Sequence, residues 1–217
     1  QNGVELFING SNYFPEMKNM IKNAKESIDL ETYMFHNDSA GNSTAYLLAK
    51  KAAGLEGDEN KTSISSNSAN GVKVKVIFNS WQGKLDYGKE SEEVFIRAME
   101  KVKDEIHKSS FPPDQKEKAI ENLEKNLKYK FFTDGILRSD HRKVFVVDGL
   151  EATVGGMNMG SQYLSSDAYH DVMLKISGPE VRSVHKEFLE NWFEFNNLPQ
   201  PSKEEFVDPE RMREVFF

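Results

Sequence analysis

The 217-residue chain contains no cysteine, which excludes disulfides and thiolate chemistry and would leave a zinc site only His and carboxylate ligands. It also lacks an uninterrupted apolar run of the ~18 residues that a membrane-spanning helix needs. It has no basic excess, because its formal net charge is -7. That charge argues against a nucleic-acid partner, since phosphate backbones favour basic surfaces. What is present is aromatic mass for a core: 15 Phe and 7 Tyr.

Strand-like and helix-like patterns alternate along the chain. Residues 28–35 and 72–79 alternate apolar and polar side chains as strands do, and residues 14–28 and 43–53 have helical spacing. This order predicts an α/β domain with a substantially parallel sheet. A further strand is expected near 169–178 and a closing amphipathic helix over 180–195, with Val184, Phe188 and Trp192 facing inward.

We predict one domain over residues 1–198. The polar, Gly/Ser/Asn-rich segment 54–69 is expected to be a mobile surface insertion. Residues 89–128 have the pattern of two helices, which Phe111-Pro112-Pro113 separates. Residues 199–217 are expected to be a linker followed by the possible start of a second copy of the domain.

The stretch HRKVFVVDGLEATVGGMN, from His141 to Asn158, concentrates the residues that could carry chemistry. Side chains alternate along a strand, so His141 and Lys143 are expected on one face. Asp148-Gly149 has the composition of a hairpin turn, and the returning strand would bring Asn158 back toward the first two residues. One hairpin would thus gather an imidazole, a cation and an amide.

These three groups suit a phosphoryl group. Lys143 would neutralise one non-bridging oxygen and Asn158 would donate a hydrogen bond to another. A neutral His141 could attack phosphorus and form a phosphohistidine, with Asp171 as the candidate acceptor on its other nitrogen. This chemistry needs no metal and no cofactor. The alternative is that these are ordinary exposed strand and turn residues, but the complete spacing favours the functional interpretation.

The spacing His-x-Lys-x4-Asp-x6-Gly-Gly-x-Asn resembles the HKD signature of the phospholipase D superfamily. Residues 8–78, without the insertion, and residues 169–192 resemble the amino-terminal half of bacterial cardiolipin synthases and related phospholipases. The resemblance covers most of residues 4–195 and is poor over the insertion and the helical pair. It implies an α-β-α sandwich whose mixed sheet is flanked by helices.

The resemblance also implies roles for the motif residues. His141 would be the nucleophile or the acid/base partner. Lys143 and Asn158 would hold the phosphate, Asp148 would support the motif, and Asp171 would orient His141. Gly156 stands where many members carry Ser, which removes one hydroxyl donor.

The superfamily's active site uses two such motifs, and this chain has one. Among the other histidines, His36 could line the pocket from a loop after a strand, while His170 should point to the opposite face of its strand. His107 and His185 are expected on exposed helix surfaces. The second motif would come from a second half of the same polypeptide, for which PERMREVFF resembles an entry, or from a homodimer mate.

Three functions follow as hypotheses. The first is a phospholipid phosphodiesterase or phosphatidyltransferase that acts at a membrane surface through a phosphohistidine. The second is a homodimeric nuclease of the same superfamily, and the third is a non-catalytic half-domain that serves a partner half. The chain begins with Gln, so we expect an upstream segment in a bacterial, membrane-associated protein.

Overall fold

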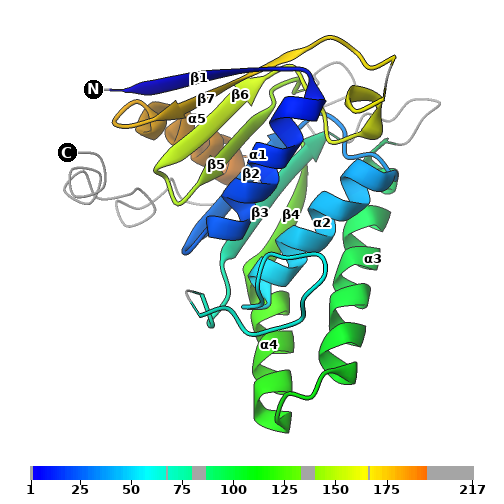
Figure 1. Ribbon diagram of the computed structural model, residues 1–217. Coiled ribbons are helices and arrows are strands. Elements are labelled where there is room, and N and C mark those ends of the chain that lie inside the picture. Colours follow the sequence, from blue (N-terminus) through cyan, green and yellow to red (C-terminus); the bar gives the residue numbers. More distant parts are fainter. Residues whose placement is uncertain (1, 67, 80–86, 133–139, 166, 195–217) are drawn as a thin grey trace.

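The computed structural model describes residues 2–66, 68–79, 87–132, 140–165 and 167–194. Within them a seven-stranded sheet has the order β1-β7-β6-β5-β2-β3-β4 (Figure 1). The strands in chain order are β1 (Gly3–Ile8), β2 (Ser27–Thr32), β3 (Lys73–Asn79), β4 (Leu127–Phe132), β5 (Val144–Val147), β6 (Glu151–Gly155) and β7 (Val172–Ser177).

The sheet is mixed, as the family resemblance implied, and the expectation of a substantially parallel sheet is wrong for one half of it. Strands β2, β3 and β4 are parallel because helical crossovers connect them. Strands β5, β6, β7 and β1 pair antiparallel, and β5 joins the two halves through an antiparallel pairing with β2. The short β5–β6 hairpin, which the Asp148-Gly149 turn predicted, needs no crossover, and its strands are therefore antiparallel.

Four helices cover one face of the sheet (Figure 1). They are α1 (Gly10–Asn23), α2 (Ser39–Ala52), α3 (Tyr87–Lys108) and α4 (Pro113–Asn126). Alternate residues of the strands, such as Leu30, Val76 and Phe145, join Tyr13 and Leu48 of these helices in the main core. Burial of this apolar surface is the main stabilising contribution to the domain, at about 25 cal/mol per Å².

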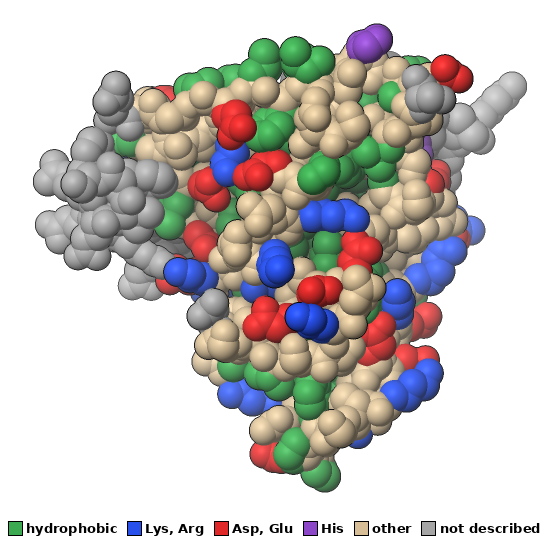
Figure 2. All heavy atoms as spheres, viewed as in Figure 1, with side chains coloured by type: hydrophobic (Ala, Val, Ile, Leu, Met, Phe, Trp, Pro, Cys, Tyr) green, Lys and Arg blue, Asp and Glu red, His purple; other side chains and the backbone are tan. Residues whose placement is uncertain are grey.

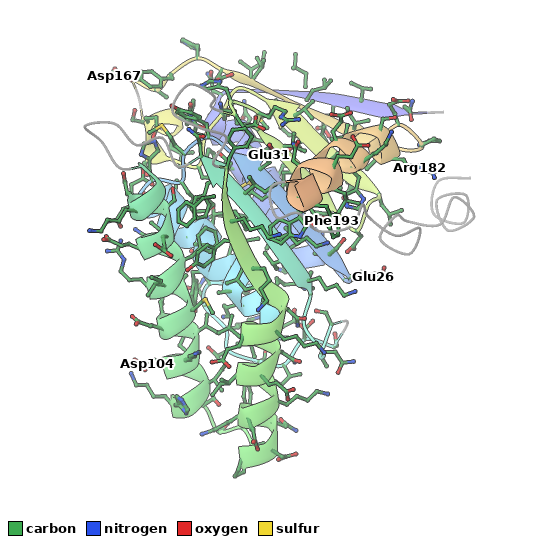
Figure 3. All side chains as sticks on the ribbon, turned by 180° about the vertical axis from the view of Figure 1, so that it is seen from behind. Glu26, Glu31, Asp104, Asp167, Arg182 and Phe193 are labelled. Atoms are coloured by element: carbon green, nitrogen blue, oxygen red, sulfur yellow. The ribbon has the colours of Figure 1, made fainter. Side chains whose placement is uncertain are left out.

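The other face is covered in part by α5 (Val181–Glu194), as Figure 3 shows from behind. Phe188 and Trp192 are buried and Val184 is partly buried, as the amphipathic pattern predicted. The expectation that His185 is an exposed helix residue is wrong. Its side chain is 4% exposed, and its Nε2 lies 2.7 Å from Asp29 Oδ2 on β2. His185 lies on the buried stripe of α5, and Asp29 gives its imidazole a polar partner there.

Segment 54–69 is held to the helical layer at the positions that the structure describes. Leu55 is buried and forms an isolated bridge with Ile64. The buried Lys50 ammonium of α2 donates to the carbonyl oxygens of Asp58 and Lys61. These hydrogen bonds to a buried ammonium hold the described part of the segment against α2. Two helices, α3 and α4, flank Phe111–Pro112, and residues 195–217 lie outside the described residues.

Candidate functional site

The residues of the HKD-like motif meet at one edge of the sheet. Because β2 and β5 are antiparallel, the carboxyl end of β2 and the amino end of β5 lie together. The carboxyl end of β6 and the amino end of β7 reach the same edge. Tyr33, Lys143, Gly156 and Asp171 follow or precede these strand ends, so strand direction alone brings four distant segments into one place.

His141 and Lys143 are in direct contact, as the strand alternation predicted. The Lys143 ammonium lies 3.0 Å from His141 Nδ1 and donates a 2.6 Å hydrogen bond to the His141 carbonyl. The His141 side chain is exposed, whereas Lys143 is buried. The ladder begins only at Val144, so these two residues project from the extended segment that enters β5.

Tyr33 is a site residue that the sequence pattern did not reveal. Its ring centroid lies 4.7 Å from that of His141, and the Lys143 ammonium lies 5.4 Å from its centroid. The ring therefore contacts both the His141 imidazole and the Lys143 ammonium, the latter through a cation–π interaction. A tyrosine directly after a buried strand carries no periodic signal, which explains the omission.

The electrostatics of the pair favour a neutral imidazole beside an ammonium. Burial lowers the pKa of Lys143 to about 8, against the opposing charges of Asp171 and Asp140. Burial, and then the Lys143 charge, lower the pKa of His141 from its ordinary value of 6.5. At neutral pH the imidazole is therefore mainly uncharged, as a nucleophile requires, and most of Lys143 is a cation.

Asn158 is buried beside these residues and ties the loop after β6 to the loop after β2. Its Oδ1 accepts a hydrogen bond from the Met34 backbone N–H at 3.2 Å, and its Nδ2 lies 3.5 Å from the Tyr163 hydroxyl. The same two loops exchange backbone hydrogen bonds between Met159 and residues 34 and 36. The side-chain amide is thus fixed in place by its oxygen. Its N–H₂ group makes only the long 3.5 Å contact to Tyr163, so it could donate to a substrate without breaking a strong hydrogen bond.

Asp171 lies against the glycine pair of the motif. A Cβ at Gly156 would collide with both carboxylate oxygens of Asp171, so glycine at this position gives that carboxylate its space. Asp171 Oδ1 accepts from the Val172 backbone N–H at 2.7 Å, and its charge acts on Lys143. Within the described residues no hydrogen bond joins Asp171 to His141, so the predicted orienting contact is not formed in this arrangement.

Asp148 lies at the opposite end of β5, five residues or about 16–17 Å along the strand from Lys143 at ~3.3 Å per residue. Its carboxylate accepts backbone N–H bonds from Lys25, Glu26 and Ser27 at 2.7–3.2 Å. Asp148 and Gly149 both have positive φ, at 54° and 64°, as the tight turn requires. Asp148 therefore supports the hairpin and lies at the other end of β5 from His141 and Lys143.

The remaining histidines make their described contacts with other residues than His141 and Lys143. His36 Nε2 is buried without a hydrogen-bond partner and its Cδ2 lies against Gly160, so it packs under the loop that carries Asn158. His170 Nδ1 contacts Asn9 Oδ1 at 3.1 Å, and His107 is exposed on α3. His185 on α5 is paired with Asp29. Among the described residues, His141 is therefore the histidine that contacts Lys143.

Three broader features concern metal ions, membranes and surface charge. Within the described residues, no cluster of three or more His, Asp or Glu side chains could hold a metal ion. No described helix has the length and apolar character to cross a bilayer. On the face that carries α1 and α2, acidic and basic side chains are interspersed (Figure 2).

Comparison with known proteins gives one family. Residues 17–192 match the family model described as cardiolipin synthase, PLD-like domain. The chain is 25% identical over 213 residues to the probable cardiolipin synthase YwiE of Bacillus subtilis, and 26% identical over 195 residues to a cardiolipin synthase of Listeria monocytogenes. These alignments cover 96% and 88% of the chain but only 35% and 33% of the relatives. The chain thus spans about a third of the relatives' length.

Solved structures share the fold. Phosphatidylserine synthase of Haemophilus influenzae superposes with a TM-score of 0.58 at 14% identity, over 98% of this chain and 41% of that one. The phospholipase D family member Nuc of Salmonella typhimurium superposes with a TM-score of 0.51 at 17% identity, over 88% of this chain and 95% of that one. At these identities the likeness concerns the arrangement of the sheet and helices.

Proposed function

Because the chain belongs to the phospholipase D-like domain family of the cardiolipin synthases, we propose that it carries one half of an active site that cleaves a phospholipid phosphodiester. The observation that carries this proposal is the 3.0 Å contact between His141 Nδ1 and the buried Lys143 ammonium, at the edge where Asn158 and Asp171 also lie. The family supports the substrate class, and the geometry supports the roles of the residues.

The first step would be attack of the His141 imidazole on phosphorus. A neutral imidazole carries one proton, and an ammonium that donates to Nδ1 leaves this proton on Nε2. Attack through Nε2 requires the proton on Nδ1 instead, where a carboxylate can accept it. Arrival of the phosphate would draw the Lys143 ammonium to a non-bridging oxygen and free Nδ1. The ring proton would then pass from Nε2 to Nδ1 through solvent, which reaches the exposed ring, and Nδ1–H would turn toward Asp171. The arrangement in the structure would then be the resting state.

Formation of the N–P bond breaks the P–O bond to the leaving alcohol, which needs a proton. The described residues hold one histidine at this site, so the general acid would come from a second half. We propose a second HKD-like segment of a longer polypeptide, with a homodimer mate as the other source. An acceptor hydroxyl, from water or from a second lipid alcohol, would then give its proton to that same group of the second half and attack phosphorus, which breaks the N–P bond and releases His141. Neither step needs a metal, because Lys143 and Asn158 would stabilise the charge.

The relatives are bacterial synthases of a membrane lipid, so we also propose a membrane surface as the place of reaction. A nuclease is the second candidate, because one motif per chain suffices when two chains pair. Trapping the covalent intermediate distinguishes the phospholipid enzyme from the nuclease. The full-length protein is mixed with a phospholipid labelled in its phosphate, and with DNA in the presence of a chelator, and the covalent adduct is mapped.

Label from the phospholipid on His141 would support the proposal. Cleavage of DNA in chelator without lipid labelling would replace it by the nuclease. An active His141→Ala protein would show that this half serves only as a scaffold. His107→Ala is the matched control, because His107 is exposed on α3 and belongs to no described site.

A further inference from the structure

A cluster of buried charged groups lies directly behind His141 and Lys143. Glu31 on β2 is 2% exposed and Asp140 is 8% exposed, and both carboxyl groups lie against the same guanidinium, that of Arg142. Arg142 Nε donates to both oxygens of Asp140 at 2.9 Å and lies 3.5 Å from Glu31 Oε1. Figure 3 shows Glu31 on the face of the sheet that carries α5.

Alternation along the chain explains why the cluster and the site are back to back. In the extended segment 140–143, Asp140 and Arg142 point toward the face of α5, while His141 and Lys143 contact each other on the other side. β5 begins only at Val144, and the one backbone bond of this segment to the sheet among the described residues is donated by the Gly155 N–H to the Lys143 carbonyl at 3.2 Å. The contacts of Asp140 and Arg142 therefore anchor the backbone that carries the nucleophile.

The two buried carboxyl groups, Glu31 and Asp140, match the single positive charge of Arg142 only if one of them is protonated. Burial first, and then Asp140, raise the pKa of Glu31 to about 8. For Asp140, burial raises the pKa, but hydrogen bonds from Arg142 and Glu31 outweigh it and bring the pKa to about 2. Glu31 would thus be the donor and Asp140 the acceptor, so that one buried negative charge faces Arg142, beside the exposed carboxylate of Glu187.

Other polar groups face the pair from the surrounding elements. From α5, Asn191 Nδ2 donates to both oxygens of Glu31 at 3.1–3.2 Å, and Glu187 lies 3.9 Å from Arg142. Asp29 and His185 are paired two residues earlier on the same face of β2. Every oxygen of Glu31 thus meets a donor or shares a proton, which is the condition for a stable buried carboxyl group.

We propose that Glu31 and Asp140 share one proton and, through Arg142, act as positioning residues that hold His141 and Lys143 toward the substrate. The role in turnover rests on the proposed function, whereas the role in holding His141 does not. Neither residue touches the site itself, so their effect on the reaction would be indirect, and the protonated state of Glu31 is the feature that sets this network apart from an ordinary ion pair.

The test compares Glu31→Gln, which resembles the protonated carboxyl group, with Glu31→Ala and Asp140→Asn. Glu187→Gln is the control, because it removes an exposed carboxylate beside the same arginine. The first readout is the NMR titration of the His141 ring in the 217-residue chain, assigned with His141→Ala. Glu31→Gln and the control should keep the wild-type midpoint, and Glu31→Ala and Asp140→Asn should shift it.

The second readout is thermal stability against pH. Glu31 is neutral in the fold but ionises at about 4.5 in the unfolded chain, so the wild type should lose stability as pH rises from 5 to 8. Glu31→Gln has no such ionisation, and its Tm should therefore rise relative to the wild type over that range. This readout covers the case in which Glu31→Ala fails to fold.

The third readout is turnover of the full-length protein. We expect kcat to fall about 10- to 100-fold in Glu31→Ala with a smaller change in KM, and to stay within about 3-fold of wild type in Glu31→Gln. A Glu31→Gln protein as impaired as Glu31→Ala, or an unshifted His141 titration in Glu31→Ala, would overturn the inference. Loss of all lipid turnover with the expected His141 shifts would refute the proposed function and leave the positioning role intact.

Discussion

The two ends of β5 carry charged side chains from the same motif, and their surroundings differ completely. At one end the Lys143 ammonium contacts a backbone carbonyl and an imidazole, and none of the described carboxylates is hydrogen-bonded to it. At the other end the Asp148 carboxylate accepts three backbone N–H groups. The Asp148 carboxylate already has its hydrogen-bond donors, so it stabilises the fold. The Lys143 ammonium lies beside the exposed His141 and can bind a substrate. Removing each charge in turn tests this difference.

The largest effect should come from His141. If it is the nucleophile, His141→Ala in the full-length protein should lower kcat by at least about 10³-fold, because no covalent intermediate can form. Circular dichroism should be unchanged, since the side chain is exposed. A loss below tenfold would mean that His141 is not the nucleophile.

Lys143→Met should lower kcat/KM by about 10²- to 10³-fold, since it removes the cation expected on the phosphate. Stability should change little or rise, because a buried ammonium is replaced by an apolar chain of similar length. Lys128→Met, on the exposed side of β4, should keep full activity. Equal losses in the two variants would contradict a specific role of Lys143.

The pH dependence should sharpen the assignment. The Lys143 ammonium is lost as pH rises through its pKa of about 8, and His141 becomes charged as pH falls below its lowered pKa. The pH profile of kcat/KM should therefore be bell-shaped, with an alkaline limb near 8 and an acidic limb below 6.5. In Lys143→Arg the alkaline limb should move upward, since arginine keeps its charge.

At the other end of β5, Asp148→Ala should lower the free energy of unfolding by about 2–4 kcal/mol, because three backbone N–H groups lose their acceptor. Activity per folded molecule should stay near wild type. Asp104→Ala, at an exposed site on α3, is the control and should be neutral. A stable but inactive Asp148→Ala protein would contradict the contrast between the two ends.

The smallest effect is expected from Gly156→Ala. The added Cβ collides with the Asp171 carboxylate, which has to move. We expect a loss of about tenfold in kcat with stability nearly unchanged, and Asp171→Asn should give a loss of similar size if Asp171 orients His141 during the reaction. An unchanged kcat in Gly156→Ala would show that the position of the Asp171 carboxylate does not affect the rate.

Alternation and turn chemistry predicted the parts of the site that lie on one strand. The contact of His141 with Lys143 and the turn at Asp148-Gly149 follow from local geometry, and the mixed sheet followed from the family resemblance. The pattern failed where side chains meet across elements. Glu31 alternates with apolar residues and reads as solvent-facing, because only the placement of α5 shows that this face is covered. His185 follows the buried spacing of α5, but its polarity suggested the surface.

The pairing of β1 with β7 has a consequence for the order of events on the ribosome. Residues 3–8 pair with residues 172–177, which emerge more than 160 residues later. At ~5–20 residues per second, the N-terminal strand waits on the order of ten to thirty seconds for its partner. During that interval its apolar side chains, of which Val4, Leu6 and Ile8 are exposed even in the finished fold, are open to other chains. Of the seven strands of the sheet, the one that is made first is therefore among the last to be paired.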